Sequence, residues 1–182
     1  QDGESAYSLA VAVDGAGCGV AVWGQVAGSL LNISANRYVP GEGWGTAVTI
    51  GGNTTGSLSE PKVAVGPSGD ATAVWYQYGL GDGLYSIWSN RYTAGEGWGE
   101  AELIEHDDST DATGVHVACD GSGNALAVWQ QADAGIPSIW SNLYVHGVGW
   151  GTAGTAEDSD GVATLPEVVF DGTGNGTAVW EQ

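Results

Sequence analysis

Three carboxylates gathered in one predicted loop are the residues whose type and spacing most readily suggest chemistry. They are Asp107, Asp108 and Asp111. Calcium takes several carboxylate and carbonyl oxygens from flexible loops, so these side chains are candidate Ca²⁺ ligands. A solvated acidic loop explains the same pattern, and the spacing is not that of an EF-hand. We therefore expect no obligatory cofactor, with Ca²⁺ at this loop as an alternative.

A second candidate site combines a cation, a carboxylate and an indole in Arg91, Glu96 and Trp98. Such a set could stack on a sugar ring and bind its hydroxyl groups, giving a carbohydrate-binding site. An earlier stretch of the chain repeats the trio, whereas a later stretch has Leu143 and Val148 in place of the charged pair. Tryptophan at a fixed position of a repeat is also typical of packing between repeats, and the sequence leaves both interpretations open.

No complete catalytic set emerges from the remaining polar residues. Glycoside hydrolysis needs a carboxylic acid of raised pKa close to a second carboxylate, and the sequence offers many carboxylates without ranking any pair. The histidines, His106, His116 and His146, do not share a position in the repeat described below. We predict a protein that is not an enzyme, with glycoside hydrolase as the remaining enzymatic alternative.

Charge excludes several kinds of partner. Three basic residues stand against 22 acidic ones, for a net charge of −19. Nucleic acids and anionic membrane surfaces require clustered cations, so neither is an expected partner. The sequence has no apolar run long enough for a membrane-spanning helix, so no membrane insertion is expected.

Several features favour an extracellular or cell-surface location. The chain opens on Gln1, which we interpret as the start of a processed mature form. Cys18 and Cys119 fall at unrelated positions, and the sequence leaves open whether they are thiols or a disulfide. Candidate N-glycosylation sites come from three Asn-x-Ser/Thr sequons, at Asn32, Asn53 and Asn175.

Internal repetition is the strongest feature of the chain. An Ala-Val-Trp segment recurs roughly every 52 residues, with a Gln two residues after each Trp. A second block, Ile-x-Ser-Asn-x-Tyr in its later copies, leads each time into a Gly-x-Gly-Trp-Gly turn. The Ala-Val-Trp tryptophans are Trp23, Trp75, Trp129 and Trp180.

The repeat unit reads as four short antiparallel strands. A Val-rich first strand ends in a Gly-rich hairpin turn, and the Ala-Val-Trp segment is the second strand. Alternation places Ala127, Trp129 and Gln131 on one side and Leu126 and Val128 on the other. Both sides are apolar, so each sheet must be covered on both. Loops of variable length between the second and third strands are predicted at 26–31, 79–85 and 132–138, on the end where binding usually resides.

This pattern predicts an all-β protein, a β-propeller of four-stranded antiparallel blades. We expect one domain over residues 1–182 with about three and a half blades, and a four-bladed ring whose last blade is incomplete. The predicted blades cover residues 8–51, 60–105, 114–156 and, for the half blade, 165–182.

The segments 35–44, 89–98 and 141–150 resemble the Asp-box hairpin of sialidase-like β-propellers. In that family a Gly-rich turn and a Trp join the third and fourth strands of a blade. Here Asn replaces the acidic position and the spacing is longer. The Ala-Val-Trp-x-Gln segment is also similar to repeats of uncharacterised prokaryotic surface proteins.

The resemblance implies a propeller fold. Sialidases of that family use an arginine triad, a Tyr–Glu pair and an Asp acid/base. Arg37 and Arg91 are the only arginines of this chain and occupy equivalent positions in successive copies, so the triad cannot be assembled from it. We therefore do not expect sialidase activity.

The incomplete last blade suggests a function. Its second strand would present an open edge, and open edges pair with other chains. Head-to-tail contacts that do not close produce filaments. We expect a structural or adhesive surface protein that forms homo-oligomers or filaments, with a multivalent lectin as the alternative. The predicted assembly edge is Ala178, Val179, Trp180, Glu181 and Gln182.

Overall fold

The computed structural model describes residues 5–79, 82–105, 109–157 and 161–182. It confirms the predicted fold class, because the described residues form strands and turns arranged as successive antiparallel sheets. Within these ranges no helix is long and apolar enough to span a membrane.

Three sheets share one plan, and a fourth contains its first two strands. In each complete sheet the first three strands form two consecutive hairpins, and two further strands, which are two residues long except for the seven-residue β5, occupy the outer position. The first sheet contains β1 (Ala6–Val13), β2 (Gly19–Ala27), β3 (Leu30–Val39), β4 (Gly43–Trp44) and β5 (Val48–Thr54). The second contains β6 (Leu58–Val65), β7 (Ala71–Tyr78), β8 (Tyr85–Thr93), β9 (Gly97–Trp98) and β10 (Glu102–Leu103). The third contains β11 (Ala112–Cys119), β12 (Ala125–Asp133), β13 (Ile136–Val145), β14 (Gly149–Trp150) and β15 (Gly154–Thr155). The fourth contains β16 (Thr164–Phe170) and β17 (Gly176–Glu181).

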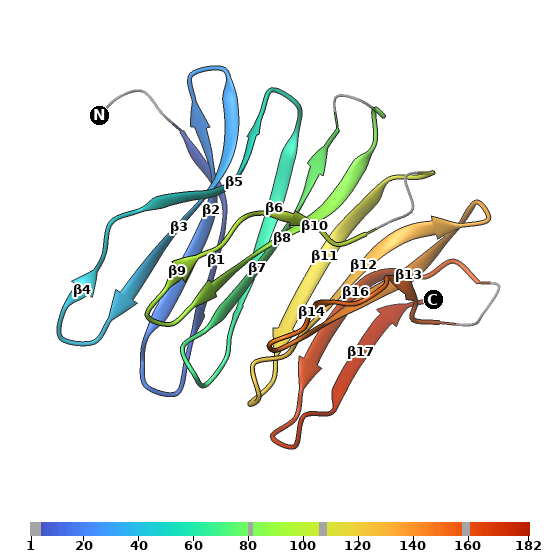
Figure 1. Cartoon of the computed structure of the whole chain (residues 1–182). Helices are drawn as coiled ribbons and strands as arrows, with labels where there is room; N and C mark the ends of the chain where they lie inside the picture. The colour runs from blue at the N-terminus through green and yellow to red at the C-terminus, as the bar shows by residue number, and fades with distance from the viewer. Residues whose placement is uncertain (1–4, 80–81, 106–108, 158–160) are drawn as a thin grey trace.

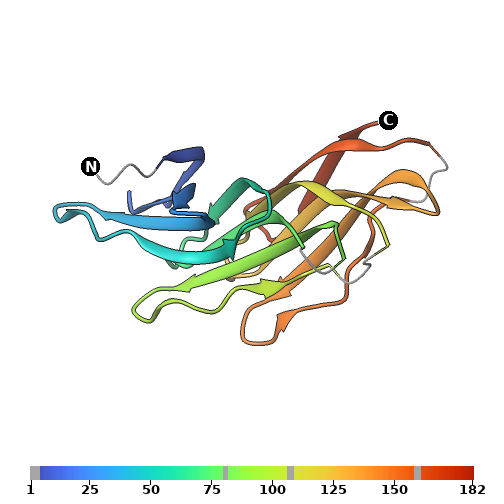
Figure 2. The same ribbon diagram turned by 90° about the horizontal axis from the view of Figure 1, so that it is seen from above.

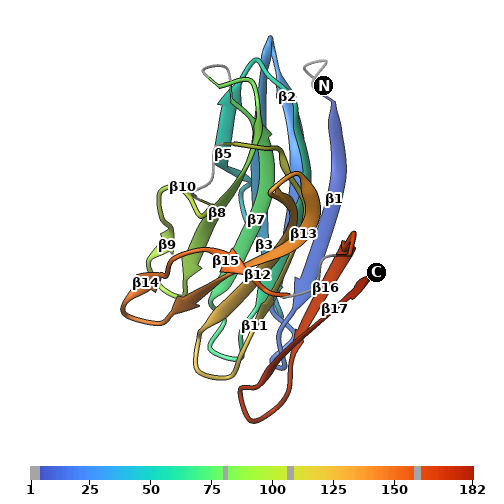
Figure 3. The same cartoon turned by 90° about the vertical axis from the view of Figure 1, so that its right-hand side faces the viewer.

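The sheets lie side by side in chain order, with β1 and β17 in the sheets at opposite ends of the row (Figure 1). Seen from above, the row forms an open arc (Figure 2), and seen along the row the short strands β9, β10 and β14 lie on one side while β1, β16 and β17 lie on the other (Figure 3). This is the arrangement of propeller blades around an axis. Closure into a ring and the number of blades in that ring stay predictions.

Three apolar cores fill the spaces between neighbouring sheets. The first includes Val22 and Ile33 from one sheet and Trp75 from the next. The middle core contains Val74 and Trp129, and the last lies between the third and fourth sheets. Each complete sheet therefore has a leading face toward the preceding sheet and a trailing face toward the following one.

The predicted alternation along β12 is confirmed. Ala127 and Trp129 enter the core shared with the second sheet, whereas Leu126 and Val128 pack toward the fourth. Trp75 has the equivalent position in the second sheet, and it lies so close to Gly51 that a Cβ atom there would collide with the indole. A glycine at this position lets the fully buried ring approach the backbone of the preceding sheet.

The predicted variable loops are wrong for two of the three copies. β2 ends at Ala27 and β3 begins at Leu30, so a two-residue turn replaces the loop, and Ala134-Gly135 does the same in the third sheet. Gly28 and Gly135 have φ of 63° and 86°, and Ala134 has φ of 48°, values that tight hairpin turns require. The strands are longer than the apolar pattern indicates because polar residues at their ends still pair.

Each sheet begins slightly before its predicted blade boundary. The cause is a bulge in every first strand, which interrupts the alternation. Three of these bulges contain a non-glycine residue in the left-handed region, at Ser8, Glu60 and Leu165. Pairing resumes beyond the bulge and lengthens the strand.

Candidate functional site

The structure brings the predicted sugar-binding trio together. Arg91, Glu96 and Trp98 line one groove of about 420 Å³ on the outer side of the second sheet, where Tyr144 of the third sheet forms a section of the wall. Glu102 also lines it. A groove with two aromatic rings, a guanidinium and carboxylates has the chemical groups that a polyhydroxylated ligand would use.

Arg91 is held by the protein on three sides. Its Nη1 donates to Thr72 Oγ1 at 2.6 Å, and its Nη2 donates to the Gly123 carbonyl of the next sheet at 3.2 Å. Its Cζ lies 3.9 Å from the centre of the Tyr144 ring, a cation–π contact. Arg91 therefore connects the second and third sheets and keeps one fixed orientation in the groove.

Carboxylates give the groove a predominantly acidic lining through Glu96, Glu100 and Glu102. Burial raises the pKa of Glu102 above its ordinary value, and the positive charge of Arg91 opposes that rise. Glu102 is not among the residues predicted from the sequence. The alternation of apolar and polar residues along a strand carries no information about the pKa of a carboxyl group. A second, smaller groove of about 220 Å³ lies one sheet earlier, between Arg37 and Trp98.

The recurrent Gly-x-Gly-Trp tryptophans pack between sheets. Trp98 packs against the first core, and Trp150 packs against the middle core while its Nε1 donates to Ser89 Oγ of the preceding sheet at 2.8 Å. Their counterpart Trp44 is 54% exposed. The structure thus supports the packing interpretation for these residues, and the partly exposed rim of Trp98 remains accessible in the groove.

The Trp-x-Gln spacing has a structural explanation. Trp129 Nε1 donates to Gln131 Oε1 at 2.9 Å, and Trp23 makes the same bond to Gln25. Residues two apart on a strand share a face, so the glutamine satisfies the indole N–H inside the core. Trp75 differs, because its buried Nε1 has no partner.

The asparagine of the Ser-Asn block joins neighbouring sheets, a role that the sequence did not reveal. Asn90 Nδ2 donates to the Ile50 carbonyl of the preceding sheet at 2.7 Å and to the Gly99 carbonyl of its own turn at 3.0 Å. Asn142 makes the equivalent pair of bonds. Asn36, in the first sheet, bonds with Nδ2 to the carbonyl of its own turn at 3.1 Å.

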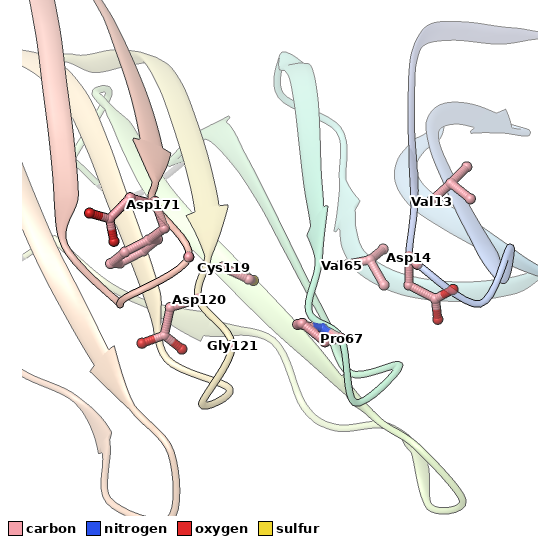
Figure 4. Close-up of a pocket in the computed structure, with 11 residues that line it drawn as sticks. Val13, Asp14, Val65, Pro67, Cys119, Asp120, Gly121 and Asp171 are labelled. Atoms are coloured by element: carbon pink, nitrogen blue, oxygen red, sulfur yellow. The ribbon is translucent and has the colours of Figure 1, made fainter.

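A shallow cavity of about 350 Å³ lies where the turns after the first strands converge (Figure 4). Asp14, Asp120 and Asp171 line it. Each carboxylate accepts hydrogen bonds from backbone N–H groups of its own turn, two and four residues later. For Asp171, the side chain and backbone of Asn175 are the main cause of a pKa well below the ordinary value. These aspartates brace the Gly-rich hairpin turns that the sequence predicts after each first strand.

The predicted calcium site cannot be assembled from the residues that the structure describes. Asp107 and Asp108 lie outside those residues. Asp111 Oδ1 accepts a hydrogen bond from the Tyr85 N–H at 2.9 Å and so braces a neighbouring turn. Among the described residues, no group of three His, Cys, Asp or Glu side chains is placed to hold a metal ion.

The predicted modification sites have different surroundings. Asn32 is the third residue of β3 and Asn53 lies in β5. Asn175 lies in a turn, where its Nδ2 donates to Asp171 Oδ2 at 2.9 Å. Glycosylation at these positions stays a prediction.

Cys18 and Cys119 are free thiols in the structure, and burial raises the pKa of the Cys119 thiol.

The first and last sheets expose surfaces that the interior sheets bury. Val63 and Val65 of β6 pack against the preceding sheet, whereas the equivalent Val11 and Val13 of β1 are 60% and 62% exposed. Exposed apolar residues continue across this leading face to Leu9. The predicted assembly edge, 178–182, coincides with β17, which among the described strands pairs with β16 alone.

Comparisons with known proteins establish the fold and no more. No protein-family model matches the chain, and no curated protein matches its sequence. Among solved structures, a protein of unknown function from Dyadobacter fermentans is 11% identical with a TM-score of 0.62, covering 90% of this chain and 53% of its own. The intramolecular trans-sialidase from Ruminococcus gnavus is 13% identical with a TM-score of 0.56, covering 90% and 36%.

An endo-arabinase from Bacteroides thetaiotaomicron is 11% identical with a TM-score of 0.51, covering 94% of this chain and 68% of its own. This chain thus spans about half of the first of these structures and about a third of the second. At such low identity the likeness concerns architecture, which agrees with the repeated sheets and their packing. The chain has the fold of the sialidase-like β-propellers.

Proposed function

We propose that this protein is a non-enzymatic, extracellular structural or adhesive propeller that self-associates. The observation that carries the proposal is the leading face of the first sheet. It presents the same valine positions that the second sheet packs, partly buried, against its neighbour. Burying a valine side chain contributes on the order of 1.5–3 kcal/mol, so a face with several such residues favours a partner with a complementary face.

A second copy can supply that complementary face. The trailing side of the fourth sheet exposes Val169 and Val179. Their equivalents in the third sheet, Ala118 and Val128, pack against the following sheet. The contact between copies would therefore repeat the chemistry of the contacts within the chain. Because the two faces lie at opposite ends of the row (Figure 1), such contacts are head-to-tail and extend into filaments unless they close.

The test is sedimentation velocity over a concentration series, with electron microscopy of the concentrated sample. We expect species larger than a monomer that grow with concentration. Val11→Asp, which places a charge on the leading face, should shift the distribution to monomer. Ile136→Asp serves as the control, because Ile136 is also exposed but lies at a hairpin turn away from both faces. A wild-type chain that stays monomeric at all concentrations would refute the proposal.

A carbohydrate-binding function is the second candidate, and the groove that unites Arg91, Glu96 and Trp98 supports it. Titration with glucose, galactose and fucose, followed by tryptophan fluorescence, tests this function, with a glycan array to extend the search. Glu96→Gln should abolish a signal that arises in this groove. Glu42→Gln, the same change in the first sheet, should retain it. A signal that both variants leave intact would place sugar binding elsewhere.

A further inference from the structure

We infer that the two grooves beside the second sheet form one binding site for an oligosaccharide of amino sugars. The larger groove, which contains Glu96, Glu100 and Glu102, would bind the ammonium group of one sugar. The smaller groove, beside Arg37, would bind the oxygens of another sugar of the same chain. The inference deepens the carbohydrate-binding candidate and rests on it, and it does not depend on self-association.

The two grooves meet at Trp98. This side chain and Gly97 line both of them, so the indole is a wall that the two grooves share. The ring of Trp98 lies edge-on to that of Tyr92, with ring centres 5.7 Å apart and planes at 65°, and this contact holds its orientation. Sheets packed face to face lie about 10 Å apart, so equivalent groups of the two grooves repeat at about that distance. A ligand that occupies both grooves is therefore extended, which favours an oligomer over a single sugar.

The smaller groove offers hydrogen-bond donors that the chain does not use. Trp150 Nε1 donates to Ser89 Oγ of the preceding sheet at 2.8 Å, whereas the first sheet has Ala35 at the position of that serine. Among the described residues, Trp98 Nε1 consequently has no acceptor. The guanidinium of Arg37 lies 5.5 Å from the centre of the Tyr92 ring and likewise donates to no described residue. These N–H groups suit the hydroxyl and ring oxygens of a sugar.

The larger groove has the opposite chemistry. Both Nη atoms of Arg91 already donate to groups of the protein, and Tyr144 covers the guanidinium. Three exposed carboxylates outnumber this one cation, and none of them accepts a hydrogen bond from a described residue. They belong to Glu96, Glu100 and Glu102. Negative charge beside the aromatic walls of a groove suits an ammonium group, through charge-assisted hydrogen bonds and cation–π contact.

Two of these carboxylates are specific to the second copy of the repeat. Glu100 and Glu102 stand where the first copy has Thr46 and Val48, which line the smaller groove. The third copy has no carboxylate at either position. The Gly-x-Gly-Trp turn forms in all three copies, so its packing does not require the two glutamates. Their effect is to make one groove acidic and leave its neighbour without that charge.

An oligomer of amino sugars matches both grooves together. The apolar faces of its rings can pack on the indole of Trp98, its oxygens accept the unused donors, and its ammonium groups pair with the carboxylates. A neutral glucan lacks the ammonium groups, and a basic peptide lacks the flat rings with oxygens at their rims. The net charge of −19 also attracts a cationic ligand at long range.

The probes are the β-1,4-linked hexamers of glucosamine and of glucose, which share one backbone and differ in the amino group. Isothermal titration calorimetry against the full 182-residue chain measures both affinities at about pH 6, where glutamates are ionised. We expect the glucosamine hexamer to bind about tenfold more tightly than the glucose hexamer, the effect of one charge-assisted hydrogen bond. It should also bind more tightly than monomeric glucosamine, which fills one groove only.

Variants test each groove separately. Glu100→Thr combined with Glu102→Val gives the larger groove the residues of the smaller one, and it should remove the preference for the glucosamine hexamer while the glucose hexamer still binds. Ala35→Ser offers the Trp98 indole an acceptor within the protein and should weaken the binding of both hexamers. Glu42→Gln removes a carboxylate of the first sheet that lines neither groove, and it should change neither affinity. Circular dichroism checks that each variant is folded.

The outcomes separate this inference from the carbohydrate-binding candidate. Equal affinities of the unsubstituted chain for the two hexamers overturn the inference and leave the candidate standing. Failure to bind either hexamer also overturns the inference, and the titration with glucose, galactose and fucose then decides the candidate by itself. Tetralysine that binds as tightly as the glucosamine hexamer would show attraction to charge alone, which overturns the inference as well.

Discussion

Asn90 and Asn36 occupy equivalent positions in the second and first sheets. Replacing each of them by alanine measures how much the hydrogen bond between sheets contributes to the free energy of unfolding. Asn90 is 1% exposed and donates to one carbonyl of the preceding sheet and one of its own turn. Asn90→Ala removes both bonds and leaves the buried Ile50 carbonyl without this donor. A hydrogen bond contributes about 1 kcal/mol net, and an orphaned buried acceptor costs about 1–3 kcal/mol. We expect a loss of roughly 2–3 kcal/mol in the free energy of unfolding.

Asn36→Ala is the matched control. Asn36 donates with Nδ2 to the carbonyl of its own turn, in exposed surroundings. The same substitution therefore removes the bond within the turn but no bond between sheets. We expect a loss of about 1 kcal/mol or less. The difference between the two variants, about 1–2 kcal/mol, is the contribution of the bond between sheets.

Guanidinium unfolding followed by tryptophan fluorescence and far-ultraviolet circular dichroism gives both values. Repeat arrays can unfold in more than one step, so the two signals must coincide before a single free energy is assigned. Equal losses for the two variants in dilute solution would refute the reasoning, because the bond between sheets would then contribute nothing. Under conditions of self-association, Asn36→Ala should become the more costly change if a second copy covers the first sheet.

Other regions yield further expectations. Gly51→Ala forces a methyl group into a buried indole and should cost about 1–3 kcal/mol in urea or guanidinium unfolding, whereas Gly15→Ala, which meets open space, should change stability by less than about 0.5 kcal/mol. Burial lowers the pKa of His116, and Glu167, 2.9 Å away, opposes this only partly. Stability should therefore be full above about pH 6.5 and fall as the pH drops below it, and His116→Gln should flatten that pH dependence in thermal unfolding. Because the chain carries a net charge of −19, self-association should strengthen between about 0.01 and 0.15 M salt, as charge repulsion is screened; sedimentation at the two salt concentrations checks this.

Much of the fold could be predicted because the sheets bury both faces. The alternation at Ala127, Val128 and Trp129 identifies a strand covered on two sides, and in a sequence without helical periodicity stacked sheets provide that environment. The first-strand bulges could not be predicted, since residues such as Ser8 and Glu60 give no sign that they adopt positive φ. Packing against other parts of the fold stabilises those conformations. The local sequence pattern carries no information about that packing.

The candidate sites were only partly predictable. Spacing in the repeat placed Arg91, Glu96 and Trp98 near each other, but it could not show that Tyr144 of the next sheet completes the groove. The spacing also did not indicate that Glu102 lines the groove. It did not indicate the hydrogen bonds by which Thr72 and Gly123 hold the Arg91 guanidinium. Contacts between neighbouring repeats decide these features, and one repeat read alone does not contain them.

The repeat itself explains why the exposed faces of the first and fourth sheets are suited to the proposed self-association. Every sheet carries a leading face and a trailing face, and the two fit each other wherever sheets meet in the chain. Among the described residues, the leading face of the first sheet and the trailing face of the fourth sheet expose Val11 and Val179, whose positions are covered in the interior sheets. Two changes occur in the third copy, where Leu143 and Val148 replace the charged pair beside the two-stranded fourth sheet. The surface beside the fourth sheet is thus less charged than the equivalent surfaces of the earlier copies, while the net charge of −19 opposes unspecific association.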